Sequence, residues 1–395
     1  MIRARHAPFR VLVGLPSFNE ADTIAAVTAD LDAAVTTLPF PAEALLVNAD
    51  NASTDGTPGT FLATATTSPK HVVTTAHAAG KGTNTVALLT FGCEQDFDAI
   101  VSVDTDLAEV PASWIHALVG AVHEGAEVCY PLRPPTWNGG DLTYQLAYPV
   151  LAGVFGADLR EPLCGDIALS RRAAQRILAE PWTAGELRYG GDFLIASLAV
   201  TQPWHTVTLT RKRRNKLRSF STAPDGEYRM GGKFAENVRA VQRRAALRLR
   251  QDPPEHLVSS VSQTPVEPDF VVPADDPDIA LLAESTGRRL REDARDEAFT
   301  VFPALLAGQL QLHASSDDAS GGLPWPTWRD CLVAWIRNHD APDERAIPVE
   351  LLETLFLSRV VGHHAEIAGT RGWYSTVLDQ AQDLFTHRHA LWGTP

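Results

Sequence analysis

The chain has 395 residues, 45% of them apolar, which is enough for two or three domains with substantial cores. Its net charge of −14 argues against general nucleic-acid binding, so we expect no nucleic-acid partner. Four widely spaced cysteines without a Cys-x-x-Cys pair indicate neither a zinc site nor a disulfide framework, and we expect a cytoplasmic protein.

The N-terminal half alternates apolar strand patterns with helical patterns. Short apolar runs separated by helices are typical of a mostly parallel sheet with both faces covered, an α/β fold. Ligands of such sheets bind at the carboxyl ends of the strands. The predicted strands are 10–15, 44–48, 71–75, 99–103 and 127–131, and the predicted helices are 19–38, 83–93 and 111–123.

After residue 134 the rhythm changes to helices at 142–155, 170–179 and 191–200, followed by a strand at 207–210. This strand leads into a strongly basic region. Residues 205–250 hold 13 lysines and arginines against 3 acidic residues, a local charge of +10 that leaves −24 for the rest of the chain. Such a region suits phosphates, anionic lipid or RNA, although a solvated cationic loop explains it as well.

The C-terminal third carries helical patterns and no catalytic motif. Residues 251–277 are rich in proline and aspartate and are interpreted as a linker. We therefore expect a catalytic domain over 1–250 and a helical domain over 278–395, which packs against it or pairs subunits as a homodimer. No stretch approaches about 18 uninterrupted apolar residues, so we expect no transmembrane segment.

The fourth predicted strand ends in Asp104-Thr105-Asp106. Two carboxylates at this spacing are hard oxygen ligands that suit Mg²⁺ or Mn²⁺, and such a cation can bridge nucleotide phosphates. A surface turn is the commoner explanation of Asp-x-Asp alone. The polar loops after the other strands favour the metal site.

Each of the first three predicted strands is also followed by polar or glycine-rich residues. Pro16, Asn19 and Glu20 follow the first strand and are explained by a helix cap or by a nucleoside pocket. Asp50 and Ser53 follow the second, where an Asx turn is an equally good explanation. Gly80-Lys81-Gly82 follows the third strand, and its backbone amides and the lysine charge suit the binding of an anion. The segment does not have the spacing of a Walker loop.

In this order, the four loops resemble the nucleotide-sugar half of GT-A fold glycosyltransferases, over residues 10–215. The loop 162–166 (PLCGD) resembles the Pro-Leu-Ala-Gly-Glu loop of glucosyl-3-phosphoglycerate synthases. The segment 189–192 (YGGD) is similar to their Gly-Tyr/Phe-Gly-x-Glu segment. The C-terminal region is similar in placement to that of mannosylglycerate synthases. The resemblance implies a Rossmann-like GT-A sheet flanked by helices, with a helical C-terminal region.

The resemblance also implies a role for each matching residue. The nucleoside would be held by the first two loops, the diphosphate or sugar by Lys81, and the ribose or sugar by Asp104. Asp106 would bind the metal, with Asp104 as its neighbouring carboxylate, and Asp192 would act at the reaction centre. The residues of the nucleoside and acceptor subsites would be Pro16, Asn19, Glu20, Asp50 or Ser53, and Leu163, Cys164, Gly165 and Asp166.

One position departs from the family pattern. Family members carry a metal-binding histidine shortly after the late strand, where this chain has Arg214. An arginine cannot ligate a cation, so Arg214 either neutralises the diphosphate directly or leaves a weak Mg²⁺ or Mn²⁺ site formed by Asp106 and the phosphates. We favour the second alternative.

The implied reaction moves a hexose from a UDP- or GDP-linked sugar to a small anionic acceptor such as 3-phosphoglycerate or glycerate. The resemblance implies retention at the anomeric carbon, whereas an inverting reaction would make Asp192 or Asp166 the general base. A polyprenyl-phosphate acceptor is an alternative. So is a catalytically silent nucleotide-binding homologue, because the histidine position is altered.

Overall fold

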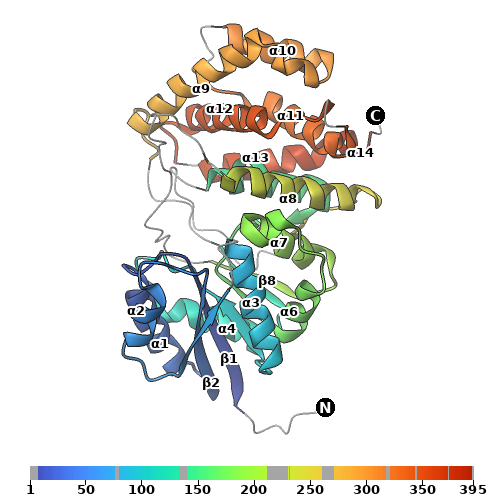
Figure 1. Ribbon diagram of the computed structural model, residues 1–395. Helices are drawn as coiled ribbons and strands as arrows, with labels where there is room; N and C mark the ends of the chain where they lie inside the picture. Colours follow the sequence, from blue (N-terminus) through green and yellow to red (C-terminus); the bar gives the residue numbers. More distant parts are fainter. Residues whose placement is uncertain are drawn as a thin grey trace. The chain divides into compact units, whose positions relative to one another are not determined.

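A seven-stranded sheet in the order β3-β2-β1-β4-β7-β5-β8 organises the N-terminal half of the chain (Figure 1). All neighbouring strands are parallel except β7, which runs antiparallel to both β4 and β5. This mostly parallel sheet, flanked by helices, confirms the predicted α/β fold. Its strands are β1 (Phe9–Ser17), β2 (Ala42–Asp50), β3 (Lys70–Thr74), β4 (Ala99–Ser102), β5 (Val128–Leu132), β7 (Ile167–Ser170) and β8 (Thr206–Thr210).

The computed structural model describes residues 8–75, 80–132, 140–210, 230, 232–259, 271–316, 321–342, 345–371 and 373–393. The chain divides into two compact units. The first unit comprises Met1–Arg133, Leu163–Arg218 and Ser260–Pro265, and the second comprises Pro134–Pro162, Ser219–Ser259 and Val266–Pro395.

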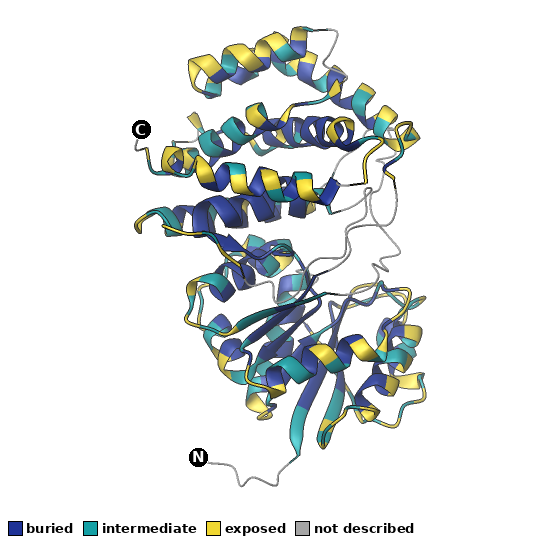
Figure 2. Cartoon of the chain, turned by 180° about the vertical axis from the view of Figure 1, so that it is seen from behind, coloured by how far each residue is buried: buried dark blue, intermediate teal, exposed yellow. Residues whose placement is uncertain are grey.

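The sheet of the first unit is covered on both faces, as its apolar strands require. On one face, β1 presents Val11, Val13 and Leu15 to a core shared with α1 (Ile24–Thr36) and α4 (Ala112–His123). The strands that carry this core are buried along most of their length (Figure 2). On the opposite face, α3 (Lys81–Glu94) packs so closely that a Cβ at Gly14 would lie 2.6 Å from Leu88.

The remaining helices of the first unit are shorter. The predicted helix over 19–38 begins only at Ile24, because the residues before it are held in a loop by bonds to the β2 end. Strand β7 was not predicted, and a serine at its end caps the next helix by accepting from the amide of Ala173 at 3.2 Å. The shorter helices of the first unit are α2 (Thr57–Ala63), α6 (Arg171–Leu178) and α7 (Gly191–Thr201), together with the π-helical turn η2 (Glu186–Gly190).

The second unit is mainly helical. Its described elements are η1 (Thr143–Ala147), α5 (Tyr148–Phe155), α8 (Gly232–Leu249), α9 (Pro277–Arg295), η3 (Ala298–Val301), α10 (Ala304–Ser315), α11 (Trp325–Arg337), η5 (Asn338–Asp340), α12 (Val349–Ile367), α13 (Trp373–Thr386), α14 (His389–Trp392) and the short strands β6 (Ala157–Asp158) and β9 (Val258–Ser259). None of the helices in the described part of the chain combines the length and the apolar character that crossing a membrane requires.

The division differs from the expected domain boundary at residue 250. Helices α5 and α8 precede that residue, yet they group with the C-terminal helices. The physical reason lies in α5, which is buried at all of its residues and contacts α13 and α8. A helix that is apolar on every side has to be covered on every side.

A buried arginine joins η1 to the C-terminal helices of the second unit. The guanidinium of Arg359 is fully buried and donates to Gln145 Oε1 at 2.9 Å, to the Leu323 carbonyl at 2.9 Å and to Glu366 Oε1 at 2.7 Å. Trp328 Nε1 donates to the Gln145 carbonyl at 2.6 Å. Trp328 is itself fully buried.

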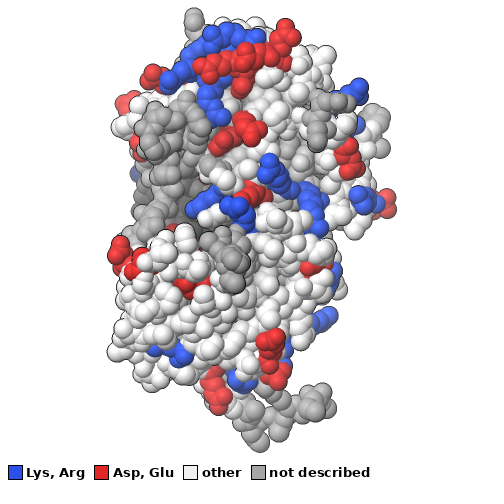
Figure 3. Space-filling view, viewed as in Figure 1, with Lys and Arg blue, Asp and Glu red and all other residues white. Residues whose placement is uncertain are grey.

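Helix α9 presents a mixed charged surface and one partly buried acid. Its exposed arginines alternate with acidic residues, as is typical of a solvated face (Figure 3). Asp293 lies instead against α12, and burial raises its pKa to about 6, with smaller opposing effects from Arg289 and from a hydrogen bond to Thr354.

We expect the raised pKa of Asp293 to make the second unit more stable as the pH falls. The folded state prefers the protonated acid, so stability from this group rises as the pH drops through about 6 towards the ordinary value of 3.8. Asp293→Asn should therefore raise the melting temperature at pH 7 and flatten its dependence between pH 7 and pH 5. The variant Glu284→Gln, at an exposed position of the same helix, should change neither, and an unaltered profile in Asp293→Asn would contradict the assignment.

Candidate functional site

Lys81, the first residue of α3, lies between two carboxylates at the carboxyl end of the sheet. Its Nζ is 2.8 Å from Asp104 Oδ1 and 3.5 Å from Asp192 Oδ2. The three side chains are 21%, 8% and 16% exposed, respectively. Burial alone would lower the pKa of Lys81, but the two carboxylates outweigh it and raise that pKa above its usual range. Lys81 is thus a permanent cation that holds two loops together.

Asp166 holds the loop after β4 in place through a hydrogen bond. Its Oδ1 accepts the backbone amide of Asp104 at 2.7 Å, and its side chain is fully buried. Its charge also contributes to the raised pKa of Lys81. The structure therefore brings this predicted substrate-binding residue to the site as a residue that positions Asp104.

The loop 163–166 closes over the lysine. A Cβ on Gly165 would lie 1.7 Å from Lys81 Nζ and 2.9 Å from Asp104 Oδ1, so only glycine leaves room for the ion pair. Cys164 is buried and its thiol donates to the Asp166 carbonyl at 3.6 Å. Leu163 is half-buried. Of these three predicted lining residues, Gly165 makes the clearest contribution to the site.

Asp192 is positioned by the π-helical turn η2, which sequence reasoning missed. Asp192 lies in the first turn of α7, directly after this turn. The start of α3 packs against the turn's backbone: a Cβ on Gly82 would lie 2.1 Å from the Glu186 carbonyl oxygen, and Thr83 Oγ1 donates to the Leu187 carbonyl at 3.1 Å. π-Turns within helices are frequent at functional sites. The spacing of apolar residues in the sequence does not predict this turn.

The predicted nucleoside residues lie together at the ends of β1 and β2, where most of their observed bonds are internal. Asp50 accepts from Ser17 Oγ at 3.1 Å and from the amide and hydroxyl of Ser53 at 2.8 and 2.5 Å. Asn19 adopts a positive φ of 55°, its amide donates to Ser53 Oγ at 2.8 Å, and its Oδ1 accepts from the Thr54 amide at 2.9 Å. Asp50, Ser53 and Asn19 therefore shape the two loops.

The two remaining nucleoside candidates contact neighbouring loops. The Pro16 carbonyl accepts from Thr105 Oγ1 at 3.1 Å, which ties the end of β1 to the Asp-x-Asp loop. The amide of Glu20 donates to Thr57 Oγ1 at 2.8 Å, and its carboxylate accepts from Thr23 Oγ1 at 3.1 Å.

A buried polar network beneath these loops was also missed. Asn48 Nδ2 donates to the Leu15 carbonyl at 3.0 Å and to Ser17 Oγ at 2.7 Å. Asn84 of α3 donates to the Ser17 carbonyl at 3.1 Å. The sequence does contain a signal for this network, because an asparagine inside an apolar strand such as β2 needs buried hydrogen-bond partners. The network joins α3, and with it Lys81, to the nucleoside loops.

The two carboxylates predicted to bind a metal lie in different local surroundings. Asp104 faces Lys81, whereas Asp106 lies two residues further on in a turn and is partly exposed. Within the described ranges, no three His, Cys, Asp or Glu side chains gather as a metal site would require. Arg214 falls outside the described residues. Asp104 and Asp106 therefore stay predicted metal ligands, and Asp104 is paired with Lys81 in this structure.

Comparison with known proteins gives a distant similarity. No protein-family model and no curated protein matches the chain. Solved structures of glucosyl-3-phosphoglycerate synthase from Mycobacterium tuberculosis are similar to it. The complex with Mn²⁺, UDP-glucose and phosphoglyceric acid is 20% identical and covers 60% of this chain and 80% of its own, with a TM-score of 0.46. The complex with Mg²⁺ and UDP is 22% identical, with coverages of 60% and 79% and a TM-score of 0.46.

Proposed function

We propose that this chain transfers a hexose from a UDP- or GDP-linked sugar to a small anionic acceptor such as 3-phosphoglycerate or glycerate. The observation that carries the proposal is the position of Lys81, 2.8 Å from Asp104 and 3.5 Å from Asp192 at the carboxyl end of the sheet. This is the ligand edge of a parallel sheet. The strand-end loops around it follow the motif order that resembles nucleotide-sugar transferases.

In this proposal the first two loops hold the nucleoside through their shape. The side-chain oxygens of Asp50 and Asn19 already accept hydrogen bonds within the loops. Backbone groups of the two loops are therefore assigned to the base and ribose. The left-handed backbone at Asn19, with φ of 55°, is one that asparagine adopts readily, and it forms part of that loop shape.

Asp192 is assigned to the reaction centre. Breaking the sugar C1–O bond creates positive charge on the sugar and negative charge on the departing diphosphate. The Asp192 carboxylate would stabilise the former and orient the acceptor hydroxyl, and the Lys81 ammonium would stabilise the latter. We assign no step to a metal ion.

The burial of Asp166 bears on the stereochemical alternatives. A general base has to reach the acceptor hydroxyl, and Asp166 is fully buried and bonded to the Asp104 amide. In an inverting reaction the base would therefore be Asp192. In the retaining reaction that we propose, attack on the face of the leaving group needs no separate base.

Nucleotide titration followed by a transfer assay tests the proposal. We expect saturable calorimetric binding of UDP or GDP, measured with and without Mn²⁺. We also expect a glycosylated product, detected by mass spectrometry, from UDP-glucose or GDP-mannose with 3-phosphoglycerate or glycerate. Nucleotide binding without transfer or hydrolysis would contradict the enzymatic proposal and favour a silent binding protein. Absence of nucleotide binding would overturn both.

A further inference from the structure

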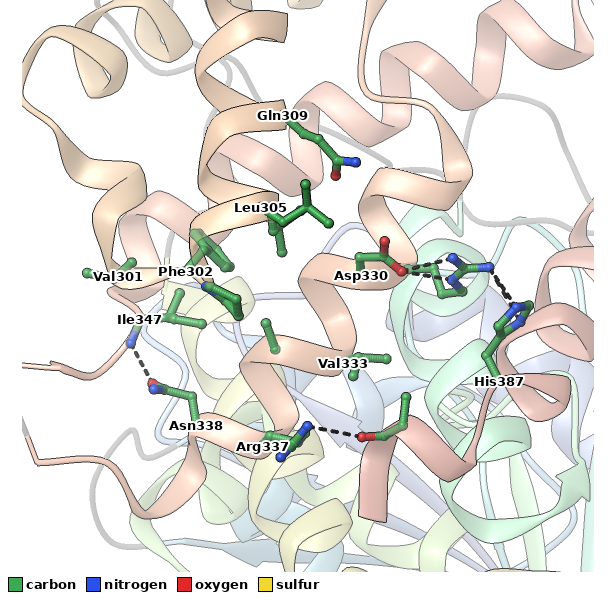
Figure 4. Close-up of a pocket in the computed structure, with 15 residues that line it drawn as sticks. Val301, Phe302, Leu305, Gln309, Asp330, Val333, Arg337, Asn338, Ile347 and His387 are labelled. Carbon is green, nitrogen blue, oxygen red and sulfur yellow. Dashed lines mark hydrogen bonds and ion pairs between the residues drawn. The ribbon is translucent and has the colours of Figure 1, made fainter. Parts of the chain in front are cut away.

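A groove in the second unit lies between α10, α11 and α14, and it has a volume of about 630 Å³. Volumes of about 300–1,000 Å³ are typical of sites for small molecules. Figure 4 shows Phe302, Leu305 and Gln309 along one side and Val333 and Arg337 along α11. No residue of this groove belongs to the Lys81 site or to the strand-end loops.

The walls of the groove are apolar. Phe302, Leu306 and Ile347 are buried and form part of its lining. Leu305 also lines it and is 80% exposed. A molecule that covered Leu305 would remove apolar surface from water at a gain of roughly 25 cal/mol per Å². The lining therefore fits a ligand with an apolar body.

Of the two arginines that line the groove, one is available to pair with a ligand. Arg329 is neutralised by Asp330 at 2.9 Å and by Asp383 at 3.1 Å. Among the residues that the structure describes, Arg337 makes a single hydrogen bond, to the Ala390 carbonyl at 3.4 Å, and no ion pair. Guanidinium groups bind carboxylates in planar, charge-assisted pairs. An anionic group would therefore be a better partner for Arg337 than the Ala390 carbonyl that it now contacts.

We propose that this groove binds a small amphiphile with one carboxylate head group. The head would pair with Arg337, and the apolar body would lie against Leu305 and Val333. The inference is independent of the proposed sugar transfer, because it uses none of the residues of that site.

Calorimetric titration with decanoate, below its micellar concentration, tests the proposal on the full chain. We expect one saturable site. Arg337→Gln should weaken binding about tenfold, since a charge-assisted bond is lost. Leu305→Asn should weaken it about fivefold through lost apolar contact. Decanol, which has the same chain length without the charge, should bind about tenfold more weakly than decanoate.

Leu312→Asn is the matched control. Leu312 lies on the same helix and is 74% exposed, but it does not line the groove, so this variant should bind decanoate like the parent chain. Absence of saturable binding, or unchanged binding in Arg337→Gln, would overturn the proposal. So would light scattering that shows a dimer dissociated by Leu305→Asn, because a second copy would then occupy the groove.

Discussion

Replacing Lys81 by methionine is expected to abolish sugar transfer and to lower the free energy of unfolding by about 3 kcal/mol. Lys81 Nζ is the cation between Asp104 and Asp192, and Asp166 adds a third negative charge nearby. Methionine keeps the apolar stem and removes only the charge. The carboxylates would then repel one another in a partly buried site, which moves Asp192 from its position. Urea denaturation and the transfer assay measure the two effects.

Lys70→Met is the matched control for this variant. Lys70 belongs to the same unit, and its Nζ donates to the Phe61 and Leu62 carbonyls at 2.9 and 2.7 Å. Its loss should cost about 1 kcal/mol and leave transfer unchanged. Wild-type transfer in Lys81→Met would contradict the assigned role of the lysine. Equal loss of transfer in both variants would show that the effect is one of general stability.

The sheet could be predicted because its signals are local. Six of its strands were predicted from short apolar runs in the sequence, and residues 10–15 of the prediction lie within β1. Parallel pairing then brings the ends of β1, β2 and β4 to one edge without further information. The exception is β7, four residues long, whose place between β4 and β5 depends on pairing with strands distant in sequence.

The partners within the site could not be predicted in the same way. Two carboxylates at i and i+2 share a face only while the chain stays extended. Here β4 ends at Ser102 and a turn begins at Thr105, and Asp104 pairs with Lys81. The ion pair joins residues 23 positions apart, and its geometry depends on the packing of α3 against η2.

The compact units differ from the predicted domain ranges for a related reason. Composition marks residues 251–277 as a linker, but composition does not say what covers α5. That helix is buried throughout and contacts α13, which lies more than 200 residues later in the chain. A helix that is apolar on all sides therefore indicates that segments elsewhere in the sequence cover it.

Gly82→Ala is expected to destabilise the chain by about 3 kcal/mol, although alanine is the better helix former. The added Cβ would lie 2.1 Å from the Glu186 carbonyl oxygen and 2.7 Å from Leu187 C, both of them backbone atoms that cannot rotate away. Either α3 or η2 must shift. Gly120 of α4 is the control, because nothing lies within 4 Å of its added Cβ and alanine should stabilise there by about 0.5–1 kcal/mol.

Gly165→Ala should separate function from stability. Its Cβ would lie 1.7 Å from Lys81 Nζ, the far end of a flexible side chain, so the lysine can yield while the backbone stays in place. We expect a stability loss of only about 1 kcal/mol, since one charged contact is displaced. Transfer should fall at least about tenfold, because the ammonium is displaced from its closer carboxylate, Asp104. Equal stability losses in Gly82→Ala and Gly165→Ala would contradict this distinction, because the backbone would then absorb both methyl groups. Full transfer in Gly165→Ala would mean that the position of Lys81 Nζ does not govern the chemistry.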